Sequence, residues 1–394
     1  MNKKTIKDLA VTGKRVFTRV DFNVPRLENG EVADDAKIKA ALPTITYLLE
    51  QGAAVILASH LGRPKGQVKD NLRLTAVAAK LAELLQLEVL KSDDVVGPDA
   101  ERLVSSLEPG QVLLLENVRF HPGEEKNDAD LAQAYARLAD IFVSDAFGTA
   151  HRAHASNAGI AAYIPAVAGF LMEKEVENLS RTLHNVQKPV LAIVGGSKTA
   201  DKISVVKNFL KLADTILLGG GMANTFLRAT GIAMGRSLVE EDQVENAAAI
   251  MREASKRNVK ISLPIDVTIA SGKKDTAGAQ YVAVDAVPAE QMALDIGPKT
   301  RIVYAKLIAK AKTIIWNGPL GVFEVEPFAQ GTIAIAKAVA ASAAFSIIGG
   351  GDVVAAVEKA GVADKISHLS TGGGATLEFW EGKELPGIAV LQDK

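Results

Sequence analysis

Residues 190–202 read VLAIVGGSKTADK, and they show on a small scale how the whole chain is built. The aliphatic, β-branched run Val190–Val194 predicts a buried strand, which the pair Gly195-Gly196 then ends. A helical stretch follows the turn. The same order of strand, glycine-rich or polar turn, and helix recurs along the chain, and it predicts right-handed βαβ crossovers that form parallel sheets.

The predicted strands fall into two sets. The first half holds Val16–Val20, Ala54–Ala58, Glu88–Leu90, Val112–Leu115 and Ile141–Val143, and the second half holds Val190–Val194, Thr215–Leu218, Lys260–Leu263, Thr313–Trp316, Phe345–Ile348 and Ile366–Leu369. Helical patterns separate the strands, among them Ile38–Gln51, Thr75–Leu85, Asp128–Leu138 and Val353–Lys359. We therefore expect an α/β protein with two doubly wound, Rossmann-like parallel-sheet domains.

The two domains are expected to meet at a helix. Residues 172–183 form an amphipathic pattern, and a second domain is expected to restart within Asn185–Pro189. This division predicts an N-terminal domain over 1–172, an interdomain helix over 173–185, a C-terminal domain over 186–377 and a tail over 378–394.

Composition excludes several classes of protein. The 394 residues include 45 Lys+Arg and 46 Asp+Glu, so the net charge of −1 gives no nucleic-acid or membrane signature. There is no cysteine, which excludes disulfides, thiolate metal sites and cysteine nucleophiles. The N-terminal MNKKTIKDLA lacks the apolar stretch of a signal peptide, and no run is long enough to span a membrane. We expect a cytoplasmic protein with small-molecule partners.

Basic side chains follow the predicted strands of the first half. Ligands of open parallel sheets bind at the carboxyl ends of strands, where Arg63, Arg119 and Arg152 stand together with His60 and His151. Converging arginines bind a multiply charged anion such as a phosphorylated carboxylate. A single arginine here is better explained as a solvated loop charge, but three on successive strand ends favour the anion site. His151 and His154 have a spacing that is weak evidence for a metal.

Glycine clusters follow the strands of the second half, at 195–196, 219–221, 349–351 and 372–374. Bare backbone at a strand end lets phosphates approach amide N–H groups. Lys198 and Lys202 are four residues apart, which predicts one face of an opening helix. Asp352 opens another helix as a magnesium ligand or a simple N-cap, two compatible roles.

Two common nucleotide-binding motifs are absent from the sequence. No Walker A loop occurs, and no Gly-x-Gly-x-x-Gly follows the first strand. An anion site on one sheet and a nucleotide-phosphate site on another suit phosphoryl transfer across a closing cleft.

Several strings are highly specific when taken together. They are RVDFNVP (19–25), SHLGRP (59–64), ENVRF (116–120), SDAFG (144–148), HRAHAS (151–156), WNGPLGVFE (316–324), GGGD (349–352) and STGGG (370–374). On these strings the chain resembles the phosphoglycerate kinase family over essentially its full length. The resemblance implies reversible, Mg²⁺-dependent phosphoryl transfer between ATP and 3-phosphoglycerate in glycolysis and gluconeogenesis, by a monomer that bends at a hinge.

The resemblance also implies residue roles. The phosphoglycerate would be held on the N-terminal domain by Asp21, Phe22, Asn23, Lys37, His60, Leu61, Gly62, Arg63, Arg119 and Arg152. The nucleotide would be held by Lys198, Lys202, Gly219, Gly220, Asn317, Glu324, Gly350, Gly351, Asp352 and Val353. Within these sets Glu324 would take the ribose, Gly219–Gly221 would lie near the adenine, and Asp352 would bind Mg²⁺. Lys37, Lys198, Lys202 and Gly373 would act on the transferring group, and the tail would pack back on the N-terminal domain.

Three positions depart from the family pattern. Lys37 replaces an arginine that contacts the acceptor carboxylate, and it keeps the charge without the planar fork, which predicts reduced turnover. Val353 replaces a hydroxyl residue and removes a possible phosphate or cap hydrogen bond. Ser197 and Thr199 flank Lys198 in place of Ala and Val, with little expected effect.

Two other classes of protein stay open on the residues alone. A catalytically weak paralogue that binds metabolites or nucleotide is favoured only by Lys37 and Val353. A nicotinamide-dependent dehydrogenase is argued from architecture alone, and the missing dinucleotide fingerprint counts against it.

Overall fold

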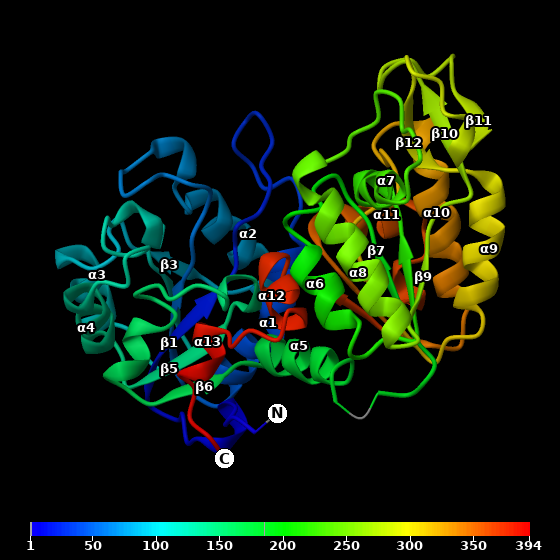
Figure 1. Ribbon diagram of the computed structural model, residues 1–394. Coiled ribbons are helices and arrows are strands. Elements are labelled where there is room, and N and C mark those ends of the chain that lie inside the picture. The colour runs from blue at the N-terminus through cyan, green and yellow to red at the C-terminus, as the bar shows by residue number, and fades with distance from the viewer. Residues whose placement is uncertain (1, 185) are drawn as a thin grey trace. The chain divides into compact units, whose positions relative to one another are not determined.

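The computed structural model describes residues 2–184 and 186–394, and its chain divides into two compact units (Figure 1). Unit 1 comprises the chain up to Glu177 together with Glu384–Lys394, and unit 2 comprises Asn178–Lys383. Helix α5 (Phe170–Ser180) runs across the boundary between them.

Unit 1 is built on a six-stranded sheet of order β3-β4-β2-β1-β5-β6, in which every pair is parallel. Its strands are β1 (Arg15–Val20), β2 (Ala54–Ala58), β3 (Val89–Lys91), β4 (Val112–Leu114), β5 (Ile141–Asp145) and β6 (Ala166–Ala168). Its helices are α1 (Ala36–Glu50), α2 (Thr75–Leu85), α3 (Pro98–Ser105), α4 (Ala129–Arg137) and α13 (Pro386–Ala389). Strands β2 and β5 are buried at every residue, which explains the apolar run AVILA of β2 and the apolar start IFV of β5.

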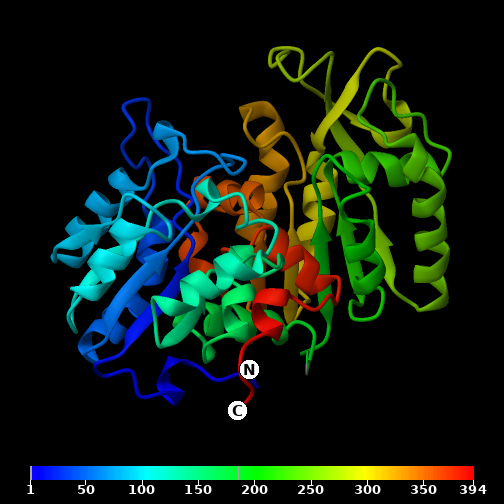
Figure 2. The same ribbon diagram turned by 90° about the vertical axis from the view of Figure 1, so that its left-hand side faces the viewer.

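The C-terminal tail is part of unit 1. The backbone of Gln392 donates to the carbonyl of Ala166 at 3.0 Å, and Lys4 donates to Gln392 at 2.7 Å. Figures 1 and 2 both show the C-terminus beside the start of the chain, where Lys3 and Asp393 form an antiparallel bridge. A tail was expected from residue 378, whereas the C-terminal part of unit 1 begins at Glu384.

Unit 2 has a second six-stranded parallel sheet, of order β15-β14-β13-β7-β8-β9. Its strands are β7 (Val190–Val194), β8 (Thr215–Leu218), β9 (Lys260–Ser262), β13 (Thr313–Asn317), β14 (Phe345–Gly349) and β15 (His368–Ser370). Its helices are α6 (Ile203–Phe209), α7 (Gly220–Ala229), α8 (Val244–Lys256), α9 (Pro298–Ile308), α10 (Glu326–Ala340), α11 (Gly351–Lys359) and α12 (Gly374–Trp380). Figure 1 shows α9 and α10 on one side of this sheet and α6 and α8 on the other.

A small antiparallel sheet in unit 2 is absent from the sequence-based expectation. It has the order β11-β10-β12, with β10 (Asp266–Ala270), β11 (Gln280–Ala283) and β12 (Met292–Ile296). Strand β10 is buried throughout, but β11 is an exposed edge strand. The four residues of β11, QYVA, are too few to show a clear alternation, so this edge strand leaves little trace in the sequence.

Each unit has its own hydrophobic core. Residues such as Val55 and Val143 contribute to that of unit 1, and Ile193, Trp316 and Val353 contribute to that of unit 2. Among the described residues, no helix combines the length and apolar character that crossing a bilayer requires.

Candidate active site

Hydrogen bonds tie the loops at the carboxyl edge of the unit 1 sheet to one another. Phe22, after β1, donates its N–H to the Ser59 hydroxyl at 2.8 Å, and Gly62 donates to the side-chain oxygen of Asn23 at 2.8 Å. From the loop after β4, Arg119 donates to the carbonyl of Gly62 at 2.8 Å. These predicted site residues therefore form one rim, which also holds Leu61 through Asn117.

Lys37 and Asp21 form an ion pair with Nζ and Oδ2 2.9 Å apart. Lys37 lies in the first turn of α1, and Asp21 directly follows β1. Burial opposes ionisation of Asp21, but the neighbouring His60 and Lys37, together with hydrogen bonds from Lys37 and Asn23, outweigh it and lower the pKa of Asp21. Burial also shifts the pKa of His60 well below its usual value, so His60 is neutral at pH 7 and Lys37 is the cation that acts on Asp21.

A buried arginine, Arg19, lies beneath this rim and was not among the predicted site residues. Its Nε donates to the Ser156 hydroxyl at 2.8 Å, and its Nη2 lies 3.3 Å from Nδ1 of His60. Ser156 donates in turn to the buried Glu124 at 2.6 Å. Arg19 is a charge within the strand sequence RVFTRV, and a buried charge requires partners, so this signal was available in the sequence.

Positive charge accumulates at this edge of the sheet. Burial lowers the pKa of Arg119, and the nearby Arg19 and Arg152 lower it further against the opposing pull of Glu125. Burial together with the same three arginines lowers the pKa of His154 to about 3, so it is neutral at pH 7. Such a cluster favours a bound polyanion, because each arginine offers a fork of donors to oxyanions.

Two further predicted residues lie at the surface of unit 1. Arg63 is exposed in the loop after β2, next to Gly62. Arg152 is exposed as well, and its Nε contacts Nε2 of His151 at 3.1 Å. Flexible, exposed arginines leave their charge available to a ligand.

In unit 2 the corresponding edge centres on β7 and β13, where the strand order reverses. Such a reversal is where open α/β sheets bind ligands. The half-buried Lys202 donates from Nζ to the carbonyl of Gly195 at 2.6 Å, and burial lowers its pKa to about 8 against the opposing effect of Asp352. A Cβ on Gly195 would come within 2.1 Å of the Pro319 carbonyl oxygen, so only glycine fits there.

The predicted helix face that joins Lys198 and Lys202 is wrong. Helix α6 begins only at Ile203, with Lys202 as its N-cap, and Lys198 is exposed in the preceding loop. The loop is held as a turn, because Lys202 donates to the carbonyl of Thr199 at 3.0 Å and the buried Thr199 hydroxyl contacts that of Thr225 at 3.1 Å.

A pocket lies between these loops and the small antiparallel sheet. It is lined by Gly196, Ser197, Gly220, Gly221, Asn224, Leu238, Lys273, Met292, Ala293, Leu294, Pro319, Gly321, Val322, Phe323, Glu324 and Asp352. The predicted nucleotide residues Gly220, Glu324 and Asp352 thus share one cavity, whereas Gly219 adjoins it as the N-cap of α7. An apolar side suits a base, and the glycine and aspartate side suits phosphates.

Sequence reasoning missed Lys273 as a residue of this pocket. It lies in the loop between β10 and β11, and its side chain is exposed. Only the unpredicted antiparallel sheet brings this loop to the pocket, so the sequence carried no usable signal.

The loop after β14 provides the remaining predicted residues. Gly350, with φ of +115°, is the N-cap of α11, and Asp352 lies in the first turn of that helix. Val353 is fully buried in the core, so any contact of Val353 with a ligand comes from its backbone N–H. Asn317 donates to the carbonyl of Gly349 at 2.5 Å, and its buried side-chain oxygen has no hydrogen-bond partner among the described residues.

Gly373 stands at the last predicted glycine loop. With φ of +52° it is the N-cap of α12, and a Cβ there would meet nothing within 4 Å. The open space beside its backbone is compatible with close approach of a ligand.

The nucleotide pocket offers a carboxylate to Mg²⁺, but the other ligands of the ion would have to come from a nucleotide and from water. No group of three or more His, Cys, Asp or Glu residues suited to a metal occurs within 2–184 and 186–394, so His151 and His154 are not part of one. Mg²⁺ commonly takes one or two protein carboxylates and completes its shell with water and substrate phosphates. Asp352, at the edge of the pocket, provides such a carboxylate.

Comparison with known proteins decides the family. The family model described as phosphoglycerate kinase matches residues 6–383. The chain belongs to the phosphoglycerate kinase family. It is similar to the phosphoglycerate kinase structures from Coxiella burnetii and Pyrococcus horikoshii OT3, with 46% and 37% identity and TM-scores of 0.90 and 0.87. Each alignment covers 98% of both chains.

The family confirms the fold and the activity expected from the sequence. The enzyme is a phosphoglycerate kinase, a glycolytic phosphotransferase with the two parallel-sheet units of its relatives. The dehydrogenase and the non-catalytic paralogue are therefore set aside.

Proposed function

We propose that unit 1 binds 3-phosphoglycerate and that unit 2 binds ATP or ADP with Mg²⁺. The observation that carries the first assignment is the gathering of Arg19, Arg119 and Arg152 at one edge of the sheet, where burial and then the charges of these arginines lower the pKa values of Arg119 and His154. The pocket that joins Glu324, Asp352 and bare glycine backbone supports the second. The predicted residue sets stay the proposed ligands of each substrate.

The chemistry needs charge neutralisation rather than a general base. The acceptor carboxylate is ionised at neutral pH; one of its oxygens forms a bond to the γ-phosphorus of ATP, and the bond from that phosphorus to the β–γ bridging oxygen breaks. The electron pair leaves with ADP. Positioning and electrostatic stabilisation account for catalysis in such reactions, and lysines and arginines supply it here.

Individual residues have proposed roles in this step. Arg63, Arg119 and Arg152 orient the phosphoglycerate, and Lys37 neutralises the reacting carboxylate. Lys202 and the exposed Lys198 balance charge on the moving phosphoryl group, together with amides at Gly373. Asp352 would hold Mg²⁺, which supplies positive charge against the phosphates of a bound nucleotide.

The remaining proposals concern the molecule in its cell. We propose a cytoplasmic monomer without nucleic-acid or membrane partners, in line with its balanced charge of −1. We also propose that the two units close on their ligands by bending near α5, since transfer requires the donor and the acceptor to meet.

The test is ATP consumption with 3-phosphoglycerate and Mg²⁺, coupled to NADH oxidation. Turnover in the usual range of about 1–10³ s⁻¹ is expected. Chelation of Mg²⁺ should abolish turnover, and Asp352→Asn should raise the Mg²⁺ concentration needed for half-maximal rate. Turnover that persists in excess chelator would contradict the magnesium role.

A separate measurement tests the division of ligands. Calorimetric titration should show that Arg119→Gln weakens 3-phosphoglycerate and leaves ADP unchanged. Glu324→Gln should do the reverse. The same loss for both ligands in both variants would contradict the assignment.

A further inference from the structure

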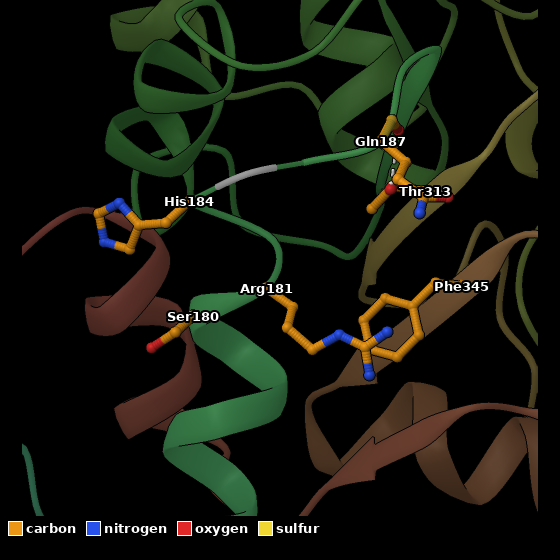
Figure 3. Close-up of a pocket in the computed structure, with 6 residues that line it drawn as sticks. All are labelled: Ser180, Arg181, His184, Gln187, Thr313 and Phe345. Carbon is orange, nitrogen blue, oxygen red and sulfur yellow. Dashed lines mark hydrogen bonds between the residues drawn. The ribbon is translucent and has the colours of Figure 1, made fainter. Parts of the chain in front are cut away.

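A second pocket of unit 2 lies at the opposite edge of its sheet from the nucleotide pocket. It has a volume of about 380 Å³ and is lined by Ser180, Arg181, His184, Gln187, Thr313 and Phe345 (Figure 3). Thr313 and Phe345 are the first residues of β13 and β14, whereas Asn317 and Gly349, at the other ends of those strands, belong to the nucleotide edge. Strands rise about 3.3 Å per residue, so the two edges are about 13 Å apart.

Arg181 is exposed to solvent, and it stacks against an aromatic ring in the wall of this pocket. Its guanidinium carbon lies 3.8 Å from the centroid of the Phe345 ring, and Figure 3 shows the group over that ring. Stacking fixes the plane of a guanidinium and leaves its N–H donors at the edge. Across residues 2–184 and 186–394, Arg181 has no hydrogen bond or ion pair, so no residue in these ranges accepts from its N–H donors.

The opposite wall of the pocket is also anchored. Thr313 donates its hydroxyl to the carbonyl of Gln187 at 2.9 Å, which ties the segment that leads into β7 to the start of β13. Figure 3 shows Gln187 on the same side of the pocket as Thr313 and Phe345, whereas the His184 ring points away from Arg181. Gln187 therefore adds a neutral carboxamide donor near the charged one.

The charge of the lining is one-sided. Arg181 is the cation that faces Phe345, and none of the lining residues is Asp or Glu. A volume of about 300–1,000 Å³ is typical of small-ligand pockets. An anion therefore meets attraction here without a competing carboxylate.

We propose that this pocket binds a small organic anion, whose carboxylate or phosphate oxygens accept hydrogen bonds from Arg181 and Gln187 while its apolar part packs beside Phe345. The site is separate from the substrate sites. Because Arg181, His184 and Gln187 lie between α5 and β7, an occupant joins this part of the chain to β14.

The experiment uses the full chain with saturating ADP, Mg²⁺ and 3-phosphoglycerate, so that the proposed substrate sites are filled. Phenyl phosphate and benzoate are titrated by ligand-observed NMR, with benzyl alcohol as the neutral analogue. Saturable binding of at least one anion is expected, with a Kd below about 10 mM. This limit asks for only weak binding, because a Kd of 1 mM corresponds to a binding free energy of about 4 kcal/mol. Phenyl phosphate alone would assign a phosphate site, and benzoate alone a carboxylate site.

Matched variants give the decisive comparison. Arg181→Gln should weaken the anion about tenfold, whereas Arg252→Gln, which removes an exposed arginine of α8 with the same charge change, should leave binding unchanged. Bound anion should also slow hydrogen exchange in residues 181–187 of the wild-type protein. Absence of saturable binding, equal binding of benzyl alcohol, or unchanged affinity in Arg181→Gln would each overturn the proposal.

Discussion

At the scale of single residues, charges gain their meaning from their neighbours. Lys37 departs from the family pattern, and its Nζ lies 2.9 Å from Oδ2 of Asp21. The ammonium group of a lysine is a single point of contact. Because that of Lys37 already contacts Asp21, it offers the acceptor carboxylate fewer hydrogen-bond donors than the guanidinium fork of an arginine would.

We therefore predict that Lys37→Arg raises kcat by about tenfold, which corresponds to about 1.4 kcal/mol of transition-state stabilisation. Arginine can keep the contact with Asp21 and direct further donors at the acceptor. The coupled assay measures it, with Lys39→Arg as the control, because Lys39 also lies on α1 and pairs with Asp35 at 2.8 Å. No rise in kcat, or an equal rise in the control, would sink the idea.

A second residue-scale prediction concerns Lys273, which lines the nucleotide pocket with an exposed side chain. Lys273→Ala should raise the KM for ATP by a factor of about 1.4 to 5, because exposed charge interactions contribute about 0.2–1 kcal/mol. The KM for 3-phosphoglycerate should stay constant. Lys274→Ala is the matched control, since the neighbouring lysine does not line the pocket. Equal effects of the two variants would show that only bulk charge matters.

At the scale of elements, helix α5 is capped by a buried carboxylate. Oδ1 of Asp145 accepts from Leu171 at 2.9 Å and Met172 at 3.2 Å, and Oδ2 has no hydrogen-bond partner among the described residues. Burial raises the pKa of Asp145 from 3.8 to about 7, against the opposing effect of Thr44 and the helix N–H groups. The cap thus carries a penalty once it is ionised.

The direction in which pH changes the stability depends on how many protons Asp145 binds in the folded and in the unfolded state. Between pH 3.8 and about 7 the folded state binds more protons at Asp145 than the unfolded state, so stability falls as pH rises through this window. The full difference corresponds to about 4 kcal/mol.

We predict that Asp145→Asn flattens this pH dependence. Near pH 8 the variant should have the higher free energy of unfolding, because the amide keeps an acceptor for the helix without a buried charge. Urea unfolding at pH 5, 6.5 and 8 measures it. The control is Asp128→Asn, which changes an exposed cap of α4. A pH dependence as steep as in the wild type would contradict the role of Asp145.

At the scale of the whole molecule, the two termini of the chain together complete unit 1. The tail adds two buried leucines, Leu385 and Leu391, and its backbone pairs with both Ala150 and Ala166. Unit 1 is therefore complete only after the chain has passed through all of unit 2.

We predict that Leu391→Ala lowers the free energy of unfolding by about 2–4 kcal/mol, as for other buried leucines. Val390→Ala, at a side chain that is 37% exposed, should cost much less. Circular dichroism follows both units, whereas Trp316 and Trp380 report on unit 2 alone. The dichroism transition should shift more than the fluorescence transition. Equal shifts of both would show that the units unfold together.

The sequence by itself determined the two parallel sheets, the family and the side chains at the strand ends. It did so because strands covered on both faces are continuous apolar runs and their carboxyl ends carry the ligand loops. The rim that joins Asn23, Gly62 and Arg119 follows from these local rules.

Only the tertiary structure decided the rest. Arg19 and Ser156 are 137 residues apart, and the pocket beside Phe345 depends on a segment near residue 181. The turn at Thr199, which keeps Lys198 off helix α6, depends on Thr225. The antiparallel sheet that brings Lys273 to the nucleotide pocket left no periodic signal. In each case the deciding contact joins residues far apart in the chain, and local pattern carries no information about such pairs.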